Sequence, residues 1–419
     1  AGVGGGGRRG GSRGGSSDGF LTGSKNGITK TNALGLNFTN KYGKNTTLES
    51  SYFYNQTDNT NDEETSREFA STGSDYYSAV NKSDSDDTNH RVNMRLTHDI
   101  NDNNRLVIRP TFSYQDNEGI DSSEAVTRDE NGDIFRETKN DYLSLTNSYN
   151  FSNEIEYLHK FGKPGRTIQV ELDTRIQNTD LKNFQDEVQT VSGQDTLINY
   201  EYNTLEKRKA YQLEVNYSEP VGNNNQLSAE YQIEYSDRTS DKKAYILDQE
   251  SEKFDFNSDL SNEFESNYTT HQSSISFTNR SFGNFFRLQA TYQHAILTND
   301  QFFPHPDNFQ RKFNNILPSI FGRVNLKDGA SMFISYRGET DEPSVSQLQN
   351  VLDRSNTLLW SLGNPELKQS YSHSLYARYE KSNIDKNSSI SNLIRFQSTQ
   401  NYVTNEITFA SEDLVIEVG

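Results

Sequence analysis

The sequence contains no cysteine, and each of its shortages excludes a class of structure. Without cysteine among its 419 residues, the chain cannot form disulfides, thiolate metal sites or a cysteine nucleophile. Apolar runs of roughly 18 residues are also missing, which excludes a transmembrane helix. No secretory signal peptide is recognisable at the start. Because Ala1 opens directly into glycine and Gly419 follows the apolar run LVIEV, we expect a fragment of a longer chain.

Apolar residues are scarce overall, yet aromatic residues are not. Hydrophobic residues make up 31% of the chain, below the roughly 45 to 50% of an average soluble domain, whereas 24 Phe and 23 Tyr help to bring the aromatic share to 11%. Disordered chains are depleted in aromatic residues, so we expect the apolar residues to be concentrated in ordered segments. The net charge of −18 argues against nucleic acid as the main partner, because phosphate binding needs a surplus of Lys and Arg.

The apolar residues that are present alternate with polar ones. In residues 167–176, for example, Ile168, Val170 and Leu172 fall on one face, and Glu171 and Asp173 fall on the other. A period of two predicts β-strands. The same alternation recurs in residues 92–100, 105–115, 211–217, 227–235, 286–292 and 332–336.

Short segments rich in Gly, Asn, Asp and Pro separate pairs of these strands and predict tight turns. They are residues 41–45, 101–104, 162–165, 220–225, 282–284, 327–329 and 384–389. Long polar stretches, such as 57–87 and 241–267, lie between the pairs and are expected to be loops. One strand on each side of every turn predicts about 14 strands in this chain.

Strands of ten or more residues, with short turns at one end and long loops at the other, favour a transmembrane β-barrel. Spanning takes roughly 9 to 11 tilted residues, with apolar side chains toward lipid and polar ones toward the lumen. Stacked soluble β-sandwiches are the alternative, but globular strands average roughly 5 to 6 residues. The predicted fold class is therefore all-β: a partial, antiparallel, up-and-down transmembrane barrel with long external loops and short periplasmic turns. Aromatic pairs near strand ends, such as Tyr231 with Tyr235, suit interfacial girdles.

In such a barrel, the charged residues that alternate with the apolar face should line the lumen. They are Arg91, Arg95, Glu171, Asp173, Arg175, Glu230 and Glu234. Lumen charges mostly pair with one another or with a plug, and we favour this explanation over a ligand-binding role. The histidines lack zinc-like spacing, and the acidic segments 84–87 and 128–133 do not match the calcium-binding loop. We therefore predict no metal, cofactor or catalytic residue.

Residues 361–379, SLGNPELKQSYSHSLYARY, carry a resemblance to a known family. The segment resembles one that reads GNP, a variable residue, LKPE and then a tyrosine-rich strand, late in the barrels of TonB-dependent receptors, especially the outer-membrane β-barrel family of Bacteroidetes. The matching residues are Gly363, Asn364, Pro365, Leu367 and Lys368, whereas Gln369 and Ser370 replace the usual Pro-Glu. Residues 316–326 and 335–353 stand upstream in the family's order, so the resemblance covers essentially the whole chain.

The resemblance implies an outer-membrane location and the barrel portion of a receptor that imports a nutrient or a metal-chelate ligand. It also implies partners: outer-membrane lipid, a plug domain of the same full-length chain, a TonB-type energy-coupling complex and, as a further candidate, a surface lipoprotein. The plug, the coupling segment and the closing strands are not found in this sequence. Two alternatives stay open: a surface barrel or adhesin without active transport, and a secreted multi-sandwich binding protein. We expect no enzyme, and the sequence does not identify the ligand.

The glycine-rich lead at residues 1–27 holds 12 of the chain's 27 glycines. Arg8, Arg9 and Arg13 lie among these glycines in the manner of an RNA-binding segment. Nothing after Gly27 supplies a basic stripe or a nucleic-acid module, so we expect no nucleic-acid partner. We predict that residues 1–27 form a flexible connection and that residues 28–419 form the barrel portion, incomplete at its C-terminus.

Overall fold

A computed structural model describes residues 26–69, 75–191, 193–281, 283–327, 329–348, 352–353, 359–364, 366–383, 387–404, 406–411 and 414–418. Almost all of these residues belong to β-strands. Apart from its last two residues, the glycine-rich lead at 1–27 lies outside the described residues, so its predicted flexibility stays a prediction. Among the described residues, no helix is long and apolar enough to cross a membrane.

One antiparallel sheet of 14 strands dominates the described residues. Its strands are β1 (Ile28–Tyr42), β2 (Thr46–Phe69), β3 (Asp75–Asn101), β4 (Asn104–Arg128), β5 (Ile134–Lys160), β6 (Thr167–Val191), β7 (Gln194–Val221), β8 (Asn225–Asp248), β9 (Lys253–Ser281), β10 (Asn284–Phe303), β11 (Asp307–Asn325), β12 (Ala330–Asp341), β15 (Ser370–Asn383) and β16 (Ser388–Gln400). The strands lie side by side in chain order, which confirms the predicted up-and-down topology. Stacked sandwiches would divide the strands among several sheets, so that alternative is wrong.

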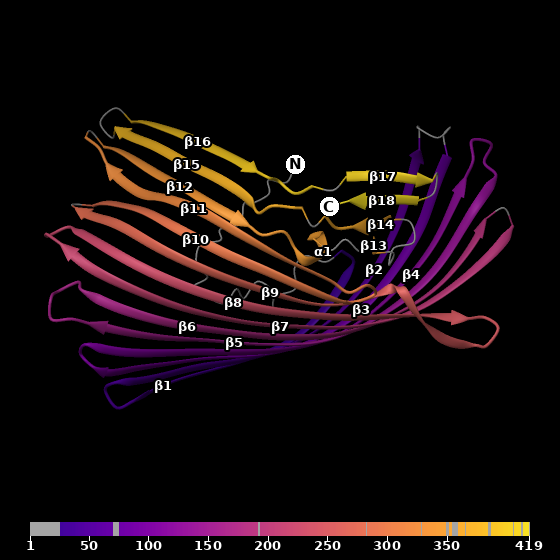
Figure 1. Cartoon of the computed structure of the whole chain (residues 1–419), viewed down its shortest axis with the longest axis horizontal. Helices are drawn as coiled ribbons and strands as arrows, with labels where there is room; N and C mark the ends of the chain where they lie inside the picture. The colour runs from indigo at the N-terminus through magenta and orange to yellow at the C-terminus, as the bar shows by residue number, and fades with distance from the viewer. Residues whose placement is uncertain are drawn as a thin grey trace.

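The sheet curls into a trough whose strands run along its length (Figure 1). Within the described residues it is not closed, because β1 and β16 each pair on one side only. A four-residue helix, α1 (Val345–Leu348), and a second small sheet lie at the open side of the trough. The small sheet contains β13 (Leu352–Asp353), β14 (Leu359–Leu362), β17 (Glu406–Ser411) and β18 (Leu414–Val418).

The predicted turns join strand pairs at one end of the sheet. Gly43 and Gly222 lie in two of these turns with φ of 63° and 68°, a conformation that glycine adopts without steric cost. At the turn between β5 and β6, Glu219 accepts hydrogen bonds from Lys163 Nζ at 2.6 Å and from Arg166 Nε at 2.6 Å. These two cations hold the pKa of the Glu219 carboxyl well below its usual range, and they fasten the turn to the end of β7.

The polar stretches that were expected to be long loops are mostly strand. Residues 57–69 and 75–87 continue β2 and β3, and most of residues 241–267 belongs to β8 and β9. The prediction of loops was wrong because it took the lack of apolar alternation as the lack of a strand. Outside the hydrocarbon layer, backbone hydrogen bonds can hold neighbouring strands together although neither face is apolar. β9 has 29 residues, about 95 Å at a rise of roughly 3.3 Å per residue, whereas a bilayer core is about 30 Å thick.

The convex face of the sheet carries the apolar side chains. Leu172 on β6 opposes Leu213 on β7, and their exposed fractions are 40% and 41%. Many other large apolar side chains of this face are also exposed, and a contiguous apolar surface of this kind is unusual for a protein in water but fits contact with lipid. The outward-facing positions of β8 are apolar or aromatic over residues 227–235 and then change to Asp237 and Thr239. This apolar stretch has the length that a tilted spanning strand needs.

Tyrosine and histidine side chains pair with one another on the lipid-facing side of the sheet. Three cross-strand pairs join a phenol oxygen to an imidazole Nδ1: Tyr52–His90 at 2.9 Å, Tyr231–His271 at 2.8 Å and Tyr336–His373 at 2.9 Å. Each pair satisfies its polar groups while its rings stay on the apolar face. The aromatic girdle at the membrane interface stays a prediction.

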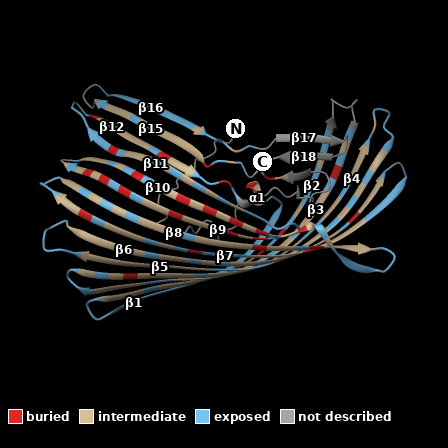
Figure 2. Cartoon of the chain, in the orientation of Figure 1, coloured by how far each residue is buried: buried red, intermediate tan, exposed pale blue. Residues whose placement is uncertain are grey.

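The concave face is mostly polar, and many of its buried side chains on β9 and β10 are small. Ser266, Thr270 and Ser274 on β9 and Thr291 on β10 are all buried, and Ser274 and Thr291 are hydrogen bonded at 2.8 Å. Figure 2 shows that many of the buried positions lie on the strands that pass beneath α1. We call the concave face of the 14-stranded sheet the wall of the trough. Small side chains on this part of the wall allow other segments of the chain to approach the sheet closely.

The orientation of the two faces is tested by placing arginine at neighbouring positions of β7. Leu213→Arg puts a charge on the lipid-facing side, at a cost of up to about 2–4 kcal/mol, and should sharply reduce the protein recovered from outer membranes. Gln212→Arg is the matched control, because Gln212 faces Asp173 and Glu234 across the two neighbouring strands. Equal recovery of the two variants would contradict the outward orientation.

Candidate functional site on the concave face

The strand register places all seven predicted lumen residues on one face of the sheet. Asn93, Thr111, Ser152 and Arg175 occupy one row across β3 to β6, so Arg91 and Arg95 share the face of Arg175. By the same parity, Glu171, Asp173, Glu230 and Glu234 also lie on this face. It is opposite to the apolar one. That these residues line a lumen stays a prediction, because the described sheet is not closed.

Several of these charges are engaged by neighbours on the same face. Arg91 Nε donates to Asn93 Oδ1 at 3.1 Å, and Asn216 Nδ2 donates to Glu230 Oε2 at 3.0 Å. Arg95 Nε lies 3.9 Å from Glu49 Oε2. Pairing of this kind was the explanation favoured over a ligand-binding role for these residues.

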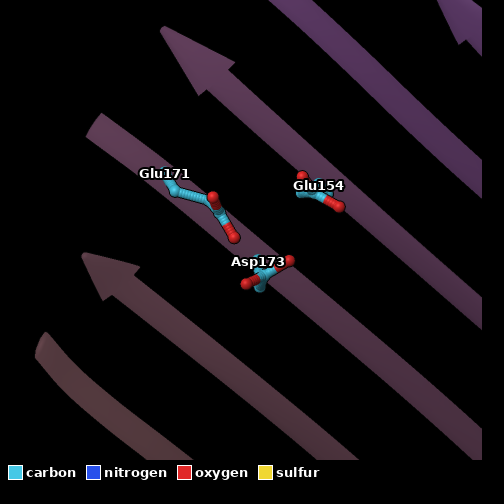
Figure 3. A group of neighbouring side chains, drawn as sticks. All are labelled: Glu154, Glu171 and Asp173. Atoms are coloured by element: carbon cyan, nitrogen blue, oxygen red, sulfur yellow. The ribbon is translucent and has the colours of Figure 1, made fainter. Parts of the chain in front are cut away.

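A cluster of carboxylates around Arg109 forms the most acidic part of this face. Glu154, Glu171 and Asp173 approach so that one oxygen of each lies within 4.8 Å of the others (Figure 3). Arg109 donates from Nη1 to Glu154, and from Nη2 to Glu156 Oε2 at 3.1 Å. One guanidinium therefore bridges two carboxylates of β5 and reduces their mutual repulsion.

Among the described residues, Glu154, Glu171 and Asp173 are the group that could hold a metal ion. Oxygen ligands of this kind suit a hard cation such as Ca²⁺. Arg109 already forms an ion pair with Glu154, however, so the carboxylates belong to an ion-pair network. We assign no metal to this cluster.

An aromatic ladder crosses the same face near the turn end of β10 to β15. The ring centroids of Phe285 and Phe321 are 5.8 Å apart, those of Phe321 and Phe333 5.3 Å, and those of Phe333 and Tyr376 5.6 Å. The guanidinium of Arg395 lies 5.6 Å from the centre of the Tyr376 ring. The concave face is therefore not uniformly polar, and this ladder was not predicted from the sequence.

The family-motif residues lie in the connection between β12 and β15. Asn364 N donates to Gln347 O at 2.6 Å, and the Asn364 side chain accepts from Glu366 N at 2.9 Å, which closes a turn typical of asparagine. Gly363 is buried, and Leu367 and Lys368 follow the turn. Pro365 lies outside the described residues. The motif therefore shapes the segment that returns the chain to the sheet.

Gln369 fastens this segment to the wall. Its Nε2 donates to the Tyr268 hydroxyl at 2.9 Å, and its Oε1 accepts from Asn315 Nδ2 at 2.7 Å. Its backbone oxygen accepts from Asn401 Nδ2 at 3.3 Å. Gln369 is 5% exposed, so these protein partners take the place of water as hydrogen-bonding partners of the buried amide. Through its side-chain amide and its backbone oxygen, Gln369 thus connects β9, β11 and the residues after β16.

A cavity of about 410 Å³ lies between the wall and residues 342–344. Its wall comes from β6 to β10, beyond the apolar band, and it includes Arg208, Arg238 and Tyr268. Burial raises the pKa of Tyr268 to about 12, so its hydroxyl stays protonated at physiological pH. The volume falls within the roughly 300–1,000 Å³ of small-molecule sites.

This cavity was not predicted from the sequence. Arg208 belongs to the run EKRKA, in which charged residues fall on both faces of the strand, so no alternation distinguishes it. Tyr268 and Gln369 are 101 positions apart in the chain. In the sequence, the signal that could have pointed to this region is the departure from the family motif at Gln369, where a glutamine replaces the usual proline.

Comparisons with known proteins agree with this architecture. The model of the outer membrane protein beta-barrel family matches residues 159–418. No curated protein matches the chain. Among solved structures, the chain is similar to BauA, the ferric preacinetobactin receptor from Acinetobacter baumannii, at 8% identity and a TM-score of 0.26, over 93% of this chain and 77% of that one. At this TM-score we base no conclusion on the similarity to BauA.

Replacement of Arg109 tests the ion-pair network. Arg109→Gln leaves Glu154 and Glu156 without their bridging cation and should lower the free energy of unfolding by about 1.5–3 kcal/mol, measured by denaturant titration of the full-length protein in detergent micelles. Adding Glu154→Gln should restore part of this stability. Arg378→Gln is the control, because the Arg378–Glu380 pair on the same face is more exposed and should contribute less than about 1 kcal/mol. An equal decrease from both arginine variants would refute the network.

Proposed function

Since the chain belongs to the outer membrane protein β-barrel family, we propose that its sheet is the wall of an outer-membrane receptor that captures and imports a ligand. The family and the lipid-facing band place the protein in the outer membrane. The TonB-dependent mechanism and an origin in Bacteroidetes are parts of the proposal that rest on the resemblance of residues 361–379. The ligand is a nutrient or a metal chelate too large or too scarce to enter by diffusion.

One observation carries the proposal: the wall extends far beyond the apolar band on one side only. At the turn end, the strands finish close to the band, whereas at the other end β2 to β9 continue for many residues with polar side chains on both faces. A pore needs only enough strand to cross the bilayer. A tall polar wall instead encloses a space outside the membrane in which a ligand can be held before transport.

The partners follow from the same proposal. A plug domain of the full-length chain would fill the trough, where Arg91, Arg95 and the carboxylates near Arg109 offer charged contacts. A TonB-type complex of the inner membrane would supply energy, and a surface lipoprotein is a candidate partner at the external rim. In this proposal the protein binds and moves its ligand without a catalytic step.

Sidedness is tested by cysteine labelling in the cysteine-free background. Glu130→Cys lies at the exposed tip between β4 and β5, and Gly162→Cys lies in the turn between β5 and β6, where an added side chain meets open space. A membrane-impermeant maleimide applied to intact cells should label Glu130→Cys only, and both variants should react after lysis. Labelling of Gly162→Cys alone in intact cells would invert the proposed orientation.

Energy dependence is tested by comparing the compounds that cells remove from their medium. With the protein present and the inner membrane energised, mass spectrometry of the medium should show at least one compound depleted that a deletion strain leaves behind. A protonophore should abolish this depletion. Depletion that survives the protonophore would refute TonB coupling, and no difference between the strains would support a surface barrel without transport.

A further inference from the structure

We propose that the cavity beneath residues 342–344 binds a ligand bearing carboxylate or phosphate groups, held by Arg208 and Arg238. This inference deepens the proposed receptor function and depends on it for its biological role. The binding itself depends only on the cavity. Its first support is position, since the cavity lies on the concave face beyond the apolar band, where a ligand arriving from outside the cell would meet the wall.

The two arginines are directly opposed across β7 and β8. Like charges in this relation repel one another and destabilise a sheet. Arg238 is partly compensated, because its Nη2 lies 3.4 Å from Glu206 Oε1. Among the described residues, no ion pair or hydrogen bond engages the Arg208 side chain. The wall therefore holds two opposed arginines, of which Arg238 is paired with a carboxylate, and an incoming anion would stabilise this arrangement.

The charges that surround the pair are evenly matched. In a chain with a net charge of −18, the cavity lining contains two arginines on the concave face, Arg208 and Arg238, and two acidic residues, Glu206 and Glu342, whereas Lys207 belongs by strand parity to the opposite face. The next acidic group toward the membrane on this face of β8 is Glu234, whose charge interacts with both Arg208 and Glu342. The opposed arginines, rather than an overall excess of positive charge, are what the cavity offers to an anion, because guanidinium groups bind carboxylate or phosphate through paired N–H donors.

Residues 342–344 form the roof of the cavity, and hydrogen bonds hold this roof in place independently of a ligand. The Gln369 amide is fixed by Tyr268 and Asn315, and Thr340 Oγ1 donates to Gln293 Oε1 at 2.9 Å. These hydrogen bonds anchor both ends of the segment that contains Glu342. Because Glu342 lines the same cavity, its carboxylate competes with a bound anion. The site therefore predicts opposite effects for removing an arginine and for removing Glu342.

The test uses full-length protein in detergent micelles and isothermal titration calorimetry. Citrate is the polycarboxylate probe, inorganic phosphate is the second anion, and trimethyl citrate is a neutral molecule with the same carbon skeleton. Wild-type protein should bind at least one of the anions and should not bind trimethyl citrate. The two anion titrations show which oxyanion the site prefers. Binding of neither anion, or equal binding of citrate and its neutral ester, would overturn the proposal.

Variants locate the binding. Arg208→Gln and Arg238→Gln should each weaken binding of the preferred anion at least about tenfold, whereas Glu342→Gln should strengthen it about two- to fivefold. Arg323→Gln, on the same face of β11 but near the turn end, should change nothing. Circular dichroism checks that each variant keeps its strand content. Unchanged affinity in Arg208→Gln and Arg238→Gln would refute the site.

The proposed function can fail without this inference, and the reverse also holds. If anion binding follows the predicted pattern but cells with and without the protein deplete the same compounds, the cavity is an anion site on a barrel that does not import. If depletion depends on the protein and on energy but the arginine variants bind and import as wild type does, the receptor function stands and the ligand is held elsewhere.

Discussion

Pairing of the backbone hydrogen-bonding groups is the constraint on which the rest of this structure depends. In hydrocarbon no water satisfies an unpaired N–H or C=O, so each strand needs a neighbour along the whole spanning length. The uninterrupted strand order from β1 to β12 and on through β15 to β16 meets this requirement for the strands inside the sheet, whereas β1 and β16 each have one unpaired edge within the described residues. Because side chains along a strand alternate strictly, the register of the ladder decides whether each side chain faces lipid or the interior. A shift of one residue in that register would exchange the two faces.

This alternation separates the chemistry of the protein into two surfaces with different freedom. The convex face tolerates little variation, since Leu172 and Leu213 meet lipid and polar groups there must be paired, as Tyr231 is with His271. The concave face carries charge at modest cost because its members neutralise one another, as Arg109 does for Glu154 and Glu156. Function is therefore expected on the concave face, where a side chain can change without loss of membrane assembly.

Some parts of this arrangement can be predicted from the sequence and others cannot, because only some of them impose a local pattern on the residues. The spanning part of β6 is predictable from residues 167–176, because lipid imposes apolar residues at every second position. Residues 57–69 are strand without that signal, because outside lipid the backbone ladder alone is sufficient. The cavity depends on the meeting of distant parts of the chain, and the pairing of Arg208 with Arg238 follows from a register that no local pattern specifies.

The departure from the family motif at Gln369 connects the fold to the cavity. A proline there could fix the direction of the chain, but it offers neither the N–H that donates to Tyr268 nor the oxygen that accepts from Asn315. The glutamine amide does both, so it holds the returning segment against the wall through side chains particular to this protein. The same Tyr268 lines the cavity. The fastening of the roof and the shape of the binding space therefore depend on one another, and a change at Gln369 would alter the cavity even though Gln369 does not line it.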